Sequence, residues 1–177
     1  ITLAVILAVK KEAILPIMVQ SGIPQTAVPL IIAIGLFITS ASNNISSVSI
    51  SLEGRNLWLL HSLPCDIGDI FFGKIMLQMI FSGIPLIIAT IITATSLGTD
   101  AVFLILLIAL SVLFTFVCSA TGLVINLIFP KMEWTNETVP IKQSLSSLLG
   151  IFSGFSYGFV LFLGAVLTIE ILSDRIF

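Results

Sequence analysis

Hydrophobic residues occur along the chain in long blocks that contain no charged side chain. Residues 13–52, 75–99, 101–130 and 143–169 contain no Asp, Glu, Lys or Arg. A helix that crosses a bilayer needs roughly 20 apolar residues, because each residue adds about 1.5 Å and the hydrocarbon layer is about 30 Å thick. Every block is at least this long, so the pattern predicts an all-α polytopic membrane protein.

Helix-breaking residues divide these blocks into four complete spans. We predict the spans at 26–43, 75–96, 101–128 and 147–171. Within the second span, Gly83 and Pro85 predict a kink. The tight turn after it has Gly98 as a helix C-terminal residue and Asp100 as an N-terminal one. The expected fold is a helical bundle.

The first 25 residues do not form a complete span. Residues 1–9 are apolar but too short to cross a bilayer, so we expect a partial span and treat 1–177 as one transmembrane domain fragment. Residues 10–25 include Pro16, Gly22 and Pro24. These residues predict an irregular or re-entrant loop.

The segment between the first two complete spans has the pattern of an amphipathic helix. Four leucines recur at i, i+7, i+8 and i+11, on one helical stripe: Leu52, Leu59, Leu60 and Leu63. Pro64 ends the pattern. We predict a short helix at 47–63 that lies along the membrane interface, with Trp58 near headgroup level. A plain interfacial linker has the same pattern.

Composition and the residue inventory exclude several functions. The chain is 58% hydrophobic and 9% charged, with mean hydropathy +1.23 and net charge −2, so a soluble domain and a nucleic-acid partner are excluded. The only histidine is His61, and no Gly-rich phosphate loop or carboxylate pair within a span is present. We therefore expect no enzyme activity, metal or cofactor in this chain.

Small and hydroxyl-bearing residues follow the last two spans. Gly150, Gly154 and Gly158 lie on one helical face, which predicts close packing against another helix or, alternatively, a sliding surface. The third span carries four hydroxyl groups: Ser111, Thr115, Ser119 and Thr121. These hydroxyls either bond their own helix backbone or line a polar path.

Two sequence blocks resemble ABC-2-type transporter permeases. The first block contains Glu53-Gly54-Arg55, Leu59-Leu60, Ser62-Leu63-Pro64 and Gly73-Lys74. The second contains Asn126, Phe129-Pro130-Lys131, Trp134, Asn136-Glu137-Thr138 and Lys142-Gln143-Ser144. The order and spacing of these blocks, with the intervening spans, resemble putative ABC transporter permease subunits over about 44–150.

The resemblance implies a function and a partner surface. The helix 47–63 would be a coupling helix that docks on a separate ABC ATPase. Residues 44–74 and 129–146 would then be cytosolic. The distribution of Lys and Arg does not decide this orientation by itself, because four lie on this side of the membrane and three on the other. The residues implied to contact the ATPase are Glu53, Gly54, Arg55, Leu57, Trp58, Leu59, Leu60, Leu63, Pro64, Lys131 and Trp134.

This interpretation places the protein in the cell membrane, as a multi-pass protein of a bacterial plasma membrane. Besides the lipid bilayer and the ATPase, a second permease copy or half is an expected partner. Two other classes fit the same hydropathy: an ion-driven secondary transporter, for which charged residues at mid-membrane are missing, and a non-transporting membrane scaffold. The transported substrate is not specified by any motif.

Overall fold

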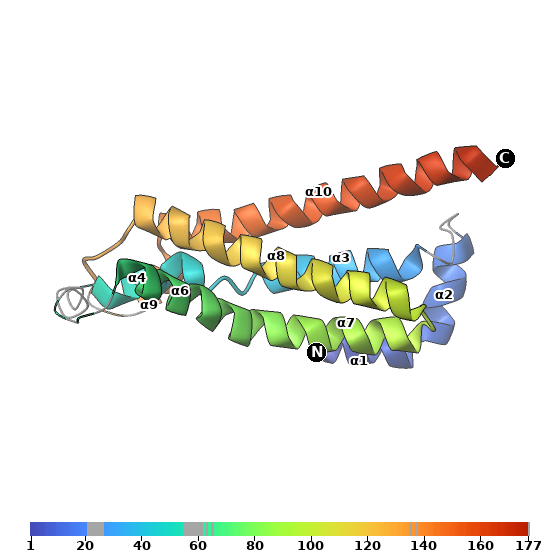
Figure 1. Ribbon diagram of the computed structural model, residues 1–177, viewed down its shortest axis with the longest axis horizontal. Coiled ribbons are helices and arrows are strands. Elements are labelled where there is room, and N and C mark those ends of the chain that lie inside the picture. The colour runs from blue at the N-terminus through green and yellow to red at the C-terminus, as the bar shows by residue number, and fades with distance from the viewer. Residues whose placement is uncertain are drawn as a thin grey trace.

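Four helical segments of the computed structural model are long and apolar enough to cross a membrane, and they run side by side (Figure 1). They are Val28–Glu53, Ile67–Ser96, Ala101–Ile128 and Leu145–Leu167. The structure describes residues 1–20, 27–54, 62, 64, 66–134, 136 and 138–176, and all regular structure in these ranges is helical. The predicted all-α class is therefore confirmed, and the length and composition of these four helices suggest a membrane protein.

The third and fourth predicted spans correspond to the two longest helices. Helix α8 (Ala101–Ile128) has the predicted bounds. Helix α10 (Leu145–Ile176) contains the predicted 147–171 and continues for several residues beyond it. The last turns of α10 contain Ser173, Asp174 and Arg175. The helix therefore extends past the apolar block 143–169, from which the span was predicted.

The second span is longer and less regular than predicted. It begins eight residues early, with α6 (Ile67–Gln78), continues through a π-helical turn, η3 (Met79–Gly83), and ends with α7 (Ile84–Ser96). Pro85 in the first turn of α7 has no backbone N–H, so the regular hydrogen-bond pattern cannot run through it. The irregularity predicted at Gly83 and Pro85 thus takes the form of a π turn.

The first span is broken. Helix α3 (Val28–Ala41) has 14 residues, or about 21 Å, which is shorter than the hydrocarbon layer. The chain leaves helical geometry at 42–45 and resumes as η1 (Ser46–Val48) and α4 (Ser49–Glu53). Ser46, Ser47 and Ser51 are fully buried in the bundle.

The described part of the predicted helix at 47–63 is not one regular helix. Helix α4 ends at Glu53, and Gly54 has φ +45°, a conformation that interrupts an α-helix. The preceding turns are buried against α8, where Ser46 Oγ pairs with Ser119 Oγ and Ser51 Oγ accepts from Asn126 Nδ2. Residues 55–61 and 63 lie outside the described part.

The prediction of an irregular or re-entrant loop at 10–25 is wrong for 11–20. These residues form α2 (Lys11–Gln20), which follows α1 (Thr2–Val9). Pro16 lies inside α2, where it removes one intrahelical hydrogen bond. Residues 21–26 are outside the described ranges.

Two kinds of packing hold the spans together. At the centre, Phe37 of α3 stacks on Phe114 of α8, with ring centroids 5.1 Å apart. Along α10, a Cβ built on Gly150 would lie 2.4 Å from Ser47 Cβ, and one on Gly154 would lie 2.7 Å from Ala41 Cβ. Gly158 lies equally close to Ile38. The predicted close packing of the glycine face is confirmed, and its partner is the first span.

Candidate functional site

Asn126 of α8 caps the short helix α4 from a different part of the chain. Its Oδ1 accepts hydrogen bonds from the backbone N–H groups of Ile50 (2.8 Å) and Ser51 (3.1 Å). These are the second and third residues of α4, whose N–H groups have no acceptor within a helix. A local N-cap side chain normally fills this role. Asn126 therefore fixes where α4 begins.

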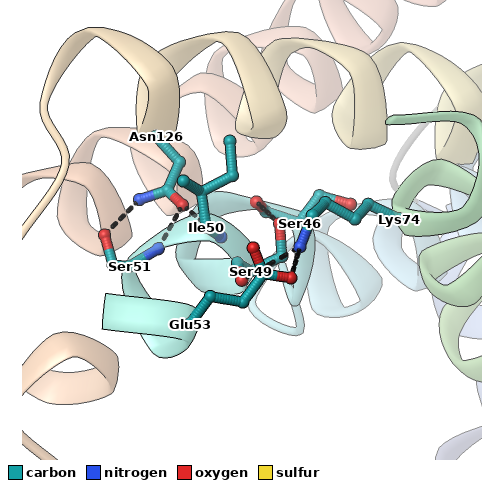
Figure 2. A network of polar contacts seen from close by, with 7 residues as sticks. All are labelled: Ser46, Ser49, Ile50, Ser51, Glu53, Lys74 and Asn126. Atoms are coloured by element: carbon teal, nitrogen blue, oxygen red, sulfur yellow. Dashed lines mark hydrogen bonds and ion pairs between the residues drawn. The ribbon is translucent and has the colours of Figure 1, made fainter. Parts of the chain in front are cut away.

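The amide nitrogen of Asn126 bonds to α4 again and also to α10. Nδ2 donates to Ser51 Oγ at 2.7 Å and to Ser146 Oγ of α10 at 2.9 Å. Asn126 is fully buried, so its hydrogen-bonding groups are all used inside the protein (Figure 2). The side chain joins α4, α8 and α10 at one point.

Ser51 also accepts hydrogen bonds from the segment that follows α8. The Lys131 backbone N–H donates to Ser51 Oγ at 3.0 Å, and Trp134 Nε1 donates to the Ser51 carbonyl at 2.8 Å. The indole packs against Gly54, where an added Cβ would lie 3.0 Å from Trp134 Nε1. We call Ser51, Asn126, Lys131, Trp134 and Ser146 the Ser51 cluster.

An ion pair holds the end of α4 to the second span. Lys74 Nζ of α6 donates to Glu53 Oε1, and it also donates to the Ser49 carbonyl at 3.2 Å (Figure 2). The Lys74 and Glu53 side chains are only 12% and 26% exposed. A partly desolvated pair of opposite charges is stronger than a surface pair, because water screens it less. Among the described residues, the buried Glu53 Oε2 has no hydrogen-bond partner.

Gln78 satisfies the backbone at the break in the first span. Its Oε1 accepts from the N–H of Ile45 (2.6 Å) and of Ser46 (3.3 Å), and its Nε2 donates to the Asn43 carbonyl at 2.7 Å. Ser46 Oγ then pairs with Ser119 Oγ of α8 at 2.8 Å. Non-helical backbone at membrane depth must be satisfied by protein groups, and here side chains do so.

The structure brings part of the predicted partner surface together. Glu53 and Gly54 of the first block lie beside Lys131 and Trp134 of the second, at the end of the bundle that also holds α9 (Thr138–Lys142) (Figure 1). Pro64 is exposed. The other predicted contact residues lie outside the described part: Arg55, Leu57, Trp58, Leu59, Leu60 and Leu63.

Sequence reasoning did not identify Ser51, Ser146, Lys74 or Gln78 as site residues. The sequence does contain a signal for this site, which is a polar stripe on α8. Its members are spaced by four, four and seven residues, so they share one helical face: Ser111, Thr115, Ser119 and Asn126. Such a stripe on an otherwise apolar span marks the side that meets polar neighbours.

The hydroxyl groups on α8 do not form an open path. Ser111 Oγ donates to the Leu107 carbonyl, Thr115 Oγ1 to the Ser111 carbonyl and Thr121 Oγ1 to the Val117 carbonyl, at 2.8–2.9 Å. Ser111, Thr115 and Ser119 are buried between helices. The first of the two interpretations, bonding to the helix's own backbone, is confirmed for these three donors.

Within the described ranges, no group of three or more His, Cys, Asp or Glu residues is placed to hold a metal ion. Comparison of the chain with protein-family models, with curated proteins and with solved structures gave no match. The contacts of the Ser51 cluster are those of a buried polar junction between helices.

Proposed function

We propose that the chain is the membrane-spanning permease subunit of an ABC-2-type, ATP-driven transporter in a bacterial plasma membrane. A separate ABC ATPase would hydrolyse ATP and dock at the end of the bundle that carries the Ser51 cluster. A second permease copy would complete the translocation unit. The resemblance of the two sequence blocks suggests this class, and the geometry supports it through one observation.

That observation is the contact of the second block with Gly54 of the first block and with Ser51, two residues before it. Residues 51–54 and 126–134 are far apart in sequence, yet Ser51 bonds to Asn126, Lys131 and Trp134. A permease needs its ATPase-facing segments at one end of the spans and rigidly joined to them. The Ser51 cluster supplies such a joint, because it connects α4, the α8–α10 connection and α10.

The proposed mechanism is mechanical. The ATPase would contact the segment that follows Gly54, including Arg55, Trp58 and the leucine pair Leu59 and Leu60. Closure of two ATPase subunits around ATP would displace this segment. Because α4 is bonded to α6 through Lys74 and to α8 and α10 through Asn126, the displacement would move three spans together.

The proposal is tested by purifying the tagged protein from its native membranes and identifying bound proteins by mass spectrometry. We expect an ABC ATPase to copurify and its ATP hydrolysis to be coupled to the permease. The double variant Glu53→Ala with Arg55→Ala should lower the recovered ATPase several-fold, because it removes the ion pair of Glu53 with Lys74, which holds the end of α4 to α6, together with the charge-assisted contact proposed for Arg55.

A matched control is Glu133→Ala, which removes an exposed carboxylate at the same end of the bundle. This variant should leave ATPase recovery unchanged. The proposal is wrong if the folded wild-type protein brings down no ATPase. It is also wrong if the double variant, with unaltered thermal stability, retains both the ATPase and its stimulated activity.

A further inference from the structure

Helix α2 lies across the end of the bundle opposite the Ser51 cluster. Figure 1 shows it transverse to the long axis, where α7 ends and α8 begins. Lys11 Nζ donates to the carbonyl of Ser96, the last residue of α7, at 3.1 Å. This contact holds the beginning of α2 at the level where the second span ends, which is the level of a bilayer surface.

The charges at the start of α2 explain the change of direction. Helix α1 ends at Val9, and Lys10, Lys11 and Glu12 follow it and are all exposed. Charged groups are costly in hydrocarbon, so the chain reaches the headgroup layer at this point. The backbone bends at Lys10, and the next helix begins at Lys11.

The rest of α2 is too apolar for water. Residues 13–19 contain no polar side chain, and α2 ends at Gln20. Directly before α2, Val5, Ile6 and Val9 of α1 form an exposed apolar surface. A surface of this kind, rimmed by lysines, is complementary to lipid: acyl chains meet the apolar residues and phosphates meet the ammonium groups.

We propose that α2 is an interfacial helix that lies parallel to the membrane surface, with the lipid headgroup layer as its partner. Its apolar residues enter the boundary between headgroups and acyl chains, and Lys10 contacts lipid phosphates. The inference depends on the membrane character of the four spans and is independent of any ATPase, so it stands or falls separately from the proposed function.

Ala13 and Gln20 give a direct test, because they lie seven residues apart on the same face of α2 and both are exposed. Each is replaced by Cys in a Cys65→Ser background and spin-labelled, while Cys118 is buried. The protein is placed in vesicles of phosphatidylcholine and phosphatidylglycerol. Collision with oxygen and with a water-soluble nickel chelate then measures the depth of each label.

We expect both labels at the same shallow depth, about 5–10 Å below the headgroup boundary. Leu113→Cys, exposed in the middle of α8, calibrates the deep position, and Glu133→Cys calibrates water. A helix that enters the membrane would separate the two labels by about 10 Å of depth, since seven residues rise about 1.5 Å each. That result, or two labels as accessible to water as Glu133→Cys, would overturn the proposal.

A charge reversal checks the lipid contact. Lys10→Glu should move the Ala13 label toward water in vesicles that contain phosphatidylglycerol and should move it less in pure phosphatidylcholine, because like charges repel. An identical shift in both lipids would contradict a contact of Lys10 with the net negative charge of the phosphatidylglycerol headgroups.

Discussion

The helices are connected in different ways at the two ends of the bundle. At the end that carries α2, α7 and α8 are joined by a short turn in which Gly98 has φ +70°. Its bonds are local: Gly98 N–H donates to the Thr95 carbonyl at 3.1 Å and Thr99 N–H to the Ala94 carbonyl at 3.2 Å. This is the predicted C-terminal glycine cap, in the geometry of a Schellman motif.

At the opposite end, a long connection enters the bundle and depends on side chains from other helices. Gln78, Asn126 and Lys74 bond to the backbone between residues 43 and 51. A short turn satisfies its own polar groups, whereas a buried break needs acceptors and donors that are supplied from a distance. The two ends should therefore respond differently to substitution.

The largest expected effect is that of Asn126→Leu. This variant removes the acceptor of two buried backbone N–H groups, each of which costs about 1–3 kcal/mol when unsatisfied, so we expect a loss of about 3 kcal/mol in unfolding free energy. Titration with sodium dodecyl sulfate in mixed micelles, followed by circular dichroism, measures this loss.

Thr121→Val is the matched control for that variant. The Thr121 hydroxyl bonds only carbonyl groups of its own helix, those of Val117 and Cys118, so its removal should cost less than about 0.5 kcal/mol. Equal losses for both variants would contradict the capping role of Asn126.

A smaller effect is expected along α10. Gly154→Val places side-chain atoms on Ala41, including its backbone, so we expect overpacking to cost about 1–3 kcal/mol. Gly164 is exposed and has open space around it, and Gly164→Val should change the unfolding free energy by less than about 0.5 kcal/mol. Thermal unfolding in detergent compares the two. A milder effect at position 154 than at position 164 would argue against the close contact with α3.

The smallest effect compares the two glycines with positive φ. Gly54→Ala and Gly98→Ala should each cost about 1 kcal/mol, because a Cβ is unfavourable in this backbone conformation. Gly54→Ala should cost more, since its Cβ would also press on Trp134, whereas Gly98 has open space. Unfolding titrations of the two variants side by side measure the difference in unfolding free energy. A larger loss for Gly98→Ala than for Gly54→Ala would contradict the close contact between Gly54 and Trp134.

Much of the helical framework could be predicted from hydropathy. The bounds of α8, the position of α10 and the turn at Gly98 all follow from uninterrupted apolar blocks and local turn chemistry. The glycine face of α10 was also visible as a repeat of four, because helical spacing alone places those residues together. Their partner on α3 was not visible, since no local pattern specifies which helix approaches.

The predicted end of the first span at residue 43 agrees with the end of α3 at Ala41, but the return of residues 46–53 into the bundle and the Ser51 cluster were decided only by the tertiary structure. The sequence predicts that the first span ends at residue 43, and the serine-rich stretch at the end of the apolar block 13–52 resembles the start of an interfacial helix. These serines enter the bundle because Gln78 and Asn126, 32 and 75 residues away from Ser46 and Ser51, supply the missing hydrogen bonds. Hydropathy determines which residues leave water, but the pairing of buried polar groups depends on contacts between segments that are distant in sequence.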